Sequence, residues 1–167
     1  MTDTLSTTAG ELPLEEVELE VGDRTWSILH TGAMISYADE RAFLGSEASA
    51  ARPYGIVLWP AAIALAHELA TRQLAGKKVL ELGAGTGLPG LVARSLGADV
   101  VQTDRQNLVL HVCKLNAERN RIAVAQQLAD WTAWTDETTY DLIIGSDILY
   151  AAALHPYLEA IFTRNLA

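Results

Sequence analysis

The stretch VLELGAGTGLPGL, residues 79–91, decides the fold of this chain. Its apolar start predicts a buried strand over residues 78–82, and its glycines lead directly into a helical pattern. Gly83, Gly85 and Gly87 have no side chains, so the backbone can turn tightly there and approach a ligand closely. The segment therefore predicts a strand, a glycine loop and a helix, with a nucleotide-like ligand at the loop.

The order of elements around this loop predicts the architecture. Strand patterns alternate with helical patterns, and such crossovers specify parallel strands with right-handed connections. The expected fold class is α/β, a Rossmann-like doubly wound parallel sheet. Predicted strands cover residues 78–82, 100–104, 122–128 and 142–144, and predicted helices cover residues 60–76, 87–96 and 108–120, with a last helix from Pro156.

The residues ahead of the first helix predict a cover for the sheet. Alternating apolar residues on both sides of Gly22 and Asp23 predict an N-terminal β-hairpin. Residues 31–53 have no clear period, which favours a loosely ordered cover. We expect a flexible N-terminus over residues 1–16 and a single domain over residues 17–167.

Composition limits the partners and the location. Twelve Lys and Arg against 21 Asp and Glu give a net charge of −9, which repels nucleic acid and favours a basic partner. No apolar stretch reaches the ~20 residues of a membrane span, so no membrane contact is expected. Cys113 is the only cysteine, and four scattered histidines lack metal-site spacing, so we expect no bound metal. A cytoplasmic location and a core position for Cys113 follow.

Acidic residues near the loop help to choose between two classes of ligand, S-adenosylmethionine and NAD. Gly85, Gly87 and Gly90 also satisfy the dinucleotide pattern GxGxxG, which alone is a weak signal. Glu81 lies inside the strand, where a carboxylate is costly unless it meets a donor or a cation. S-adenosylmethionine carries an ammonium and a sulfonium, so Glu81 favours this cofactor over NAD. Asp104 ends the next strand, where an acid can accept both ribose hydroxyls of either ligand.

Two further residues follow the third predicted strand. Asp130 offers a carboxylate for an exocyclic amine, and Trp131 offers an indole to cover an adenine face. Trp131 by itself would more often belong to the core. Its place at the carboxyl end of a strand favours the site.

These motifs together resemble the seven-β-strand methyltransferases. ELGAGTG, Asp104, the Asp130 and Trp131 pair, and SDILY at residues 146–150 carry the resemblance. Within that group the chain is similar to methyltransferase family 16, the small protein-lysine methyltransferases marked by Asp-x-x-Tyr, and VLWPAA at residues 57–62 resembles their tryptophan-bearing segment. The resemblance implies that the cofactor site is lined by Trp59, Gly83, Ala84, Gly85, Asp104, Trp131 and Ser146, and that Asp147 and Tyr150 face the substrate amine.

The chain departs from that family in the number of strands that its sequence predicts for the sheet. The family's sheet has seven strands, whereas this chain stops after the helix that follows its fourth core strand. We interpret the chain as a fragment that lacks the C-terminal strands, because residues 165–167 look like the last turn of a helix. The alternative is a short variant that protects its open sheet edge by self-association.

Several functions stay open at this point. The leading hypothesis is S-adenosylmethionine-dependent N-methylation of a protein lysine. A small amine such as a nicotinamide-like ring is an alternative acceptor, since the same cofactor-binding half serves both. A catalytically idle cofactor-binding module that acts by protein association is the second class. An NAD-dependent oxidoreductase is disfavoured by Glu81.

Overall fold

A computed structural model describes residues 4–7, 10–31 and 54–167 of the chain. Its centre is a four-stranded parallel sheet in the order β7-β6-β5-β8. The parallel α/β architecture predicted from the sequence is therefore confirmed. The strands are β5 (Lys78–Leu82), β6 (Asp99–Asp104), β7 (Ala125–Leu128) and β8 (Leu142–Ile144).

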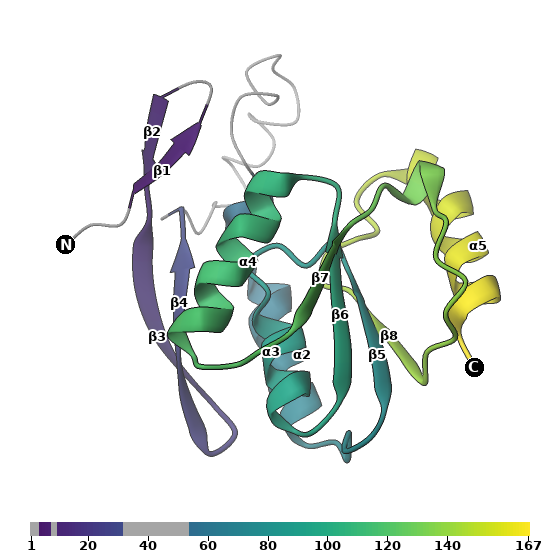
Figure 1. Cartoon of the computed structure of the whole chain (residues 1–167), viewed down its shortest axis with the longest axis horizontal. Coiled ribbons are helices and arrows are strands. Elements are labelled where there is room, and N and C mark those ends of the chain that lie inside the picture. Colours follow the sequence, from purple (N-terminus) through teal and green to yellow (C-terminus); the bar gives the residue numbers. More distant parts are fainter. Residues whose placement is uncertain (1–3, 8–9, 32–53) are drawn as a thin grey trace.

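Helices cover both faces of this sheet (Figure 1). On one face lie α2 (Pro60–Ala70), α3 (Leu88–Ser95) and α4 (Asn107–Arg119), and on the other lies α5 (His155–Asn165). Leu80 and Leu82 of β5 pack in a cluster with Leu158 and Ile161 of α5. Because side chains alternate along a strand, Val79 and Glu81 point the other way, towards α3.

The predicted N-terminal hairpin is present and packs on the helix layer. β3 (Glu15–Val21) pairs antiparallel with β4 (Arg24–His30) around Gly22, which has a φ of 62°. Trp26 of β4 is buried in the main core cluster. The hairpin thus lies outside α2 and α4, on the side away from the sheet (Figure 1).

The predicted N-terminal segments fall partly within the structure. β1 (Thr4–Thr7) pairs with β2 (Gly10–Pro13), and the flexibility of residues 1–16 stays a prediction. The predicted cover over residues 31–53 lies outside the described residues, apart from Thr31. Short 3₁₀ turns complete the chain: η2 (Tyr54–Ile56), η3 (Trp131–Ala133) and η4 (Ala152–Leu154).

The predicted end of α2 and the predicted start of β7 were wrong, because local caps end the preceding helical segments earlier or use the next residues. Helix α2 stops at Ala70 instead of Gly76, since the backbone and hydroxyl of Thr71 both donate to the Glu68 carbonyl. Strand β7 begins at Ala125 instead of Ile122. Arg121, with a φ of 57°, closes α4, and the Ile122 N–H donates to the Ala117 carbonyl at 2.9 Å. This is a Schellman cap, which uses Ile122 for the helix end.

Residues 165–167 do not form a helical turn, so that prediction was also wrong. Helix α5 ends at Asn165, and Leu166 is extended and forms a parallel bridge with Tyr140. Asn165 fixes this change of direction, because its side chain accepts from Trp134 Nε1 and donates to the carbonyls of Asp136 and Thr138. No helix in the described part of the chain is long and apolar enough to cross a membrane.

Candidate functional site

The loop between β5 and α3 is built on glycines in the left-handed region. Gly83, Gly85 and Gly87 have φ values of 62°, 58° and 82°. Other residues adopt this conformation only with strain, so the sequence here dictates the turn. A Cβ on Gly85 would lie 3.1 Å from the Gly55 carbonyl oxygen, which shows how closely the two backbone segments approach.

Trp131 and Ile148 stand beside the first glycine of the loop. A Cβ on Gly83 would come within 3.3 Å of both Trp131 Cζ2 and Ile148 Cγ2. Trp131 follows β7 and Ile148 follows β8, so the carboxyl ends of three strands meet here. Ligands of open α/β sheets bind at this edge. The structure thus brings Trp131 to the glycine loop. It also brings Ile148 there, a residue that was not singled out from the sequence.

Asp104 ends β6 directly beside the loop. Its Oδ2 lies 3.5 Å from the Gly85 nitrogen, and its Oδ1 accepts from the Gln106 N–H at 3.1 Å. Burial raises the pKa of this carboxyl above its usual value. The neighbouring Ala84 N–H donates to the Thr103 carbonyl at 2.9 Å, which ties the loop to the end of β6. A carboxyl group that can accept hydrogen bonds from hydroxyls therefore lies next to the glycine loop, whose backbone can approach a ligand.

Glu81 lies beneath the loop and meets an internal donor. The side chain is 1% exposed, and Gln102 Nε2 donates to its Oε2 at 2.7 Å. Burial raises its pKa to about 7, although the Gln102 hydrogen bond lowers it. The donor that the sequence required is thus Gln102, a residue the sequence analysis missed. A polar residue inside the apolar run of β6 was the available signal.

Two side chains of helix α4 donate hydrogen bonds to carbonyls of the glycine loop. Cys113 Sγ donates to the Gly85 carbonyl at 2.9 Å, and Asn116 Nδ2 donates to the Thr86 carbonyl at 2.9 Å. Both side chains are fully buried, and burial raises the pKa of the Cys113 thiol well above its usual value. Cys113 is therefore a core residue, as predicted, and Asn116 is a second residue that sequence reasoning missed.

Three predicted residues lie at the ends of other elements. Trp59 is half-buried at the N-cap of α2, where its carbonyl accepts from the Ala62 N–H. Asp130 is exposed, and its Oδ1 accepts from the backbone and hydroxyl of Thr132, which caps η3. Ser146 is half-buried just beyond β8. Their roles in cofactor binding stay predictions.

Asp147 and Tyr150 are exposed on either side of the buried Ile148. Asp147 has a φ of 57°, which is uncommon for a residue other than glycine, although Asp tolerates it better than most. Strained conformations of this kind cluster at functional sites. The Tyr150 side chain is 68% exposed. Ile148 packs beside Gly83, so this segment stands at the same sheet edge as the glycine loop.

Comparisons with known proteins agree with this geometry. A family model described as lysine methyltransferase matches residues 41–167. Protein N-lysine methyltransferase METTL21A of Danio rerio is 40% identical over 112 residues, which are 61% of this chain and 51% of that protein. Histone-arginine methyltransferase METTL23 of Rattus norvegicus is 36% identical over 106 residues, which are 58% of this chain and 47% of that protein.

Solved structures show the same fold. The 16S rRNA N2 G1207 methyltransferase of T. Thermophilus, in complex with AdoMet and guanosine, matches with a TM-score of 0.64 at 19% identity. The match covers 92% of this chain and 39% of that one. The chain spans about half the length of the relatives it matches, such as 40% of METTL21E of Bos taurus and 53% of METTL21A of Xenopus tropicalis. By the family match over residues 41–167, together with the glycine loop and the SDILY segment inside that range, this chain belongs to the lysine methyltransferase family.

Proposed function

We propose that this chain binds S-adenosylmethionine at the glycine loop and directs methyl transfer to a lysine side chain of a protein. The observation that carries the proposal is the juxtaposition of Gly83, Gly85 and Asp104 in a chain of this family. Relatives named protein N-lysine methyltransferase support lysine as the acceptor.

The residues at the sheet edge fit this cofactor. A Cβ at position 83 or 85 would crowd the neighbouring side chains or backbone, so the glycines keep open a close approach to the backbone. Asp104 would accept the ribose hydroxyls, and the indole of Trp131 would cover the adenine. When bound, S-adenosylmethionine supplies an electrophilic methyl group on a sulfonium centre.

The chemistry needed from the protein is positioning and loss of one proton. A lysine ammonium has no lone pair, and populating its neutral form at pH 7 costs about 3.4 pKa units, roughly 4.6 kcal/mol. Asp147 would orient the amine through its carboxylate, and Tyr150 would wall the acceptor side. Alignment of the amine with the methyl group contributes more than a strong general base in such a displacement.

Arginine is a second candidate acceptor, because relatives named histone-arginine methyltransferase match over 106 residues. Either acceptor is a cation, and the net charge of −9 suits a basic protein segment. A cytoplasmic location belongs to the same proposal, since the single cysteine cannot form an internal disulfide.

Calorimetric titration of the chain with S-adenosylmethionine, its demethylated product and NADH tests the cofactor. We expect binding of the first two and none of NADH. Methyl transfer is then measured on matched basic peptides that carry Lys, Arg or neither. Transfer to Arg alone selects the second candidate, and transfer to a free small amine selects the nicotinamide-like alternative. Cofactor binding without transfer to any acceptor favours the idle module.

The role of Asp147 has its own test. Asp147→Asn keeps the shape and tolerates the left-handed backbone, but it removes the charge. We expect turnover to fall at least about tenfold in a protein that transfers methyl groups, with S-adenosylmethionine affinity within about twofold of wild type. Wild-type turnover in the Asn variant would contradict the assignment. Tyr150→Phe serves as the milder companion variant.

A further inference from the structure

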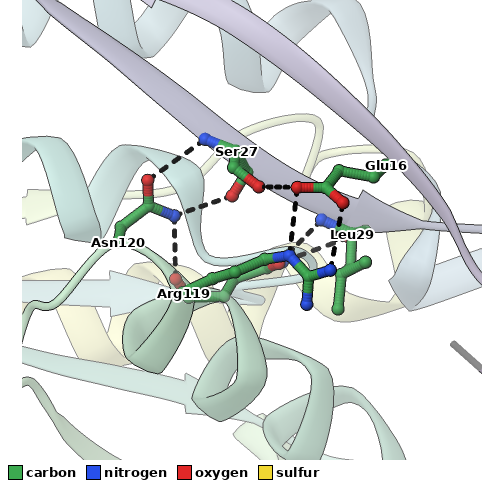
Figure 2. Close-up of polar contacts among 6 residues, drawn as sticks. Glu16, Ser27, Leu29, Arg119 and Asn120 are labelled. Carbon is green, nitrogen blue, oxygen red and sulfur yellow. Dashed lines mark hydrogen bonds and ion pairs between the residues drawn. The ribbon is translucent and has the colours of Figure 1, made fainter. Parts of the chain in front are cut away.

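Two asparagines on α4 hold the backbone of β4. Asn120 Oδ1 accepts from the Ser27 N–H at 3.1 Å, and its Nδ2 donates to the Ser27 carbonyl at 2.7 Å (Figure 2). One turn earlier, Asn116 Oδ1 accepts from the Leu29 N–H at 2.7 Å, and its Nδ2 donates to the Leu29 carbonyl at 3.1 Å. Each amide thus satisfies both backbone groups of one residue of β4.

Asn116 differs from Asn120 in one respect. Its Nδ2 also donates to the Thr86 carbonyl at 2.9 Å, so a single buried side chain joins the hairpin to the glycine loop. In the part of the chain that the structure describes, the hydrogen bonds of Asn120 reach only Ser27, Arg24 and the backbone of Asn116. Asn120 is therefore a matched control for Asn116.

The Thr86 carbonyl is the middle one of three consecutive loop carbonyls that accept hydrogen bonds from buried side chains. The Gly85 carbonyl accepts from Cys113, and the Gly87 carbonyl accepts from Gln102 Nε2 at 2.8 Å. Because the loop is rich in glycine, it loses much conformational freedom when it becomes ordered. Side chains that fix three consecutive peptide planes before a ligand arrives reduce that cost at the moment of binding.

We propose that Asn116 is a positioning residue that fixes the cofactor loop at Thr86 and couples the loop to the N-terminal hairpin through Leu29. This inference rests on the proposed function for the identity of the ligand. Coupling between the two segments is reciprocal by thermodynamic necessity. Order in the loop must therefore stabilise the hairpin at Leu29, and loss of the link must weaken cofactor binding.

Calorimetry on two single variants of the whole chain provides the first test. Asn116→Ala should raise the Kd for S-adenosylmethionine about tenfold, because it leaves the Thr86 carbonyl buried without this donor. Asn120→Ala should keep the Kd within about twofold of wild type, although it also loosens the hairpin. An Asn116→Ala protein that folds and binds like wild type overturns the inference. An equal loss of affinity in both variants also overturns it, because general loosening of the hairpin then explains the effect.

Residue-resolved amide hydrogen exchange provides a second test that a merely structural role would not pass. In the wild-type protein, the demethylated cofactor should slow exchange at the Leu29 amide at least about fivefold more than at the Ser27 amide. These two amides bond to Asn116 and Asn120 respectively, so they form an internal control. Equal slowing at both amides argues against the coupling, and this readout holds even when Asn116→Ala fails to fold.

A third arm needs no ligand and separates the inference from the proposed function. Without cofactor, Asn116→Ala should accelerate exchange at the Gly87 amide, which bonds to the Ala84 carbonyl at 2.8 Å within the loop, and Asn120→Ala should not. A wild-type chain that binds no S-adenosylmethionine refutes the proposed function alone. In that case an unchanged Gly87 rate in Asn116→Ala refutes the coupling as well, and a selective increase supports it.

Discussion

Asp104 accepts from the Gly85 N–H, and under the proposed function its carboxylate would also accept the ribose hydroxyls of the cofactor. Replacing it by Ala removes a hydrogen bond to a charged group, so cofactor binding should weaken by about 1.5 to 3 kcal/mol. Asp104→Asn, which keeps one acceptor oxygen, should lose less. Calorimetry gives the affinities, and circular dichroism checks the fold. A folded Ala variant with wild-type affinity would show that the ribose assignment is wrong.

Glu81 makes stability depend on pH, because burial raises its pKa from the ordinary 4.5 to about 7. Between these two values the folded protein holds a proton that the unfolded chain has released. The contribution of Glu81 to the free energy of unfolding should therefore fall as pH rises from about 4.5 to about 7 and level off above. The decline of this contribution is at most about 1.4 kcal/mol per pH unit.

The matched variant for this prediction is Glu81→Gln, which stands in for the protonated acid and can still accept from Gln102. Urea unfolding of both proteins at several pH values from about 5 to about 8 measures the difference. The pH slope of wild type minus Gln variant should be negative in this window. A flat or positive difference in this slope would mean that Glu81 is ionised in the folded protein. A cation close to the carboxylate would have that effect.

Among the secondary-structure elements, the β3–β4 hairpin is held to α4 by contacts of unequal strength. Arg119 forms an ion pair with Glu16 at 3.0 Å, which holds the Glu16 pKa at about 2, but both side chains are partly exposed (Figure 2). Exposed pairs of this kind contribute about 0.2 to 1 kcal/mol. The Asn120 amide is buried and satisfies two backbone groups of Ser27.

We therefore expect Asn120→Ala to destabilise the fold by about 1 to 3 kcal/mol and Arg119→Ala by less than about 1 kcal/mol. Urea denaturation of the two variants measures both values. The Arg119 effect should also shrink in high salt, whereas the Asn120 effect should not. A larger cost for Arg119→Ala would show that charge, and not backbone satisfaction, attaches the hairpin.

At the scale of the whole molecule, β8 lies at the end of the described sheet, paired with β5 on one side (Figure 1). Leu142 and Ile143 of β8 are only half-buried. Unpaired apolar strand edges recruit other chains. We therefore expect concentration-dependent self-association of the 167-residue chain in sedimentation velocity.

An added segment that pairs with β8 should cover this edge and reduce association. The unextended chain is the control at equal concentration. A chain of 167 residues that stays a monodisperse monomer at every concentration would contradict this expectation.

Local signals explain which elements were predictable from the sequence. The bounds of β5 and β8 match the prediction, and α3 and β6 match within one residue at each end, because glycines and apolar runs mark them within a few positions. The bounds of β7 and α2 were missed, since a Schellman cap and the Thr71 turn depend on backbone geometry that periodicity does not show.

The sequence by itself determined the parallel α/β sheet, the glycine loop and the acid at the end of β6, because each depends on residues close together in the chain. Only the tertiary structure decided which partners the buried polar side chains take. Glu81 required a donor, yet Gln102 is 21 positions away, and Asn116 reaches 87 positions back to Leu29 and 30 positions back to Thr86. A buried polar group must find a partner, but its choice depends on how the strands, helices and hairpin pack together.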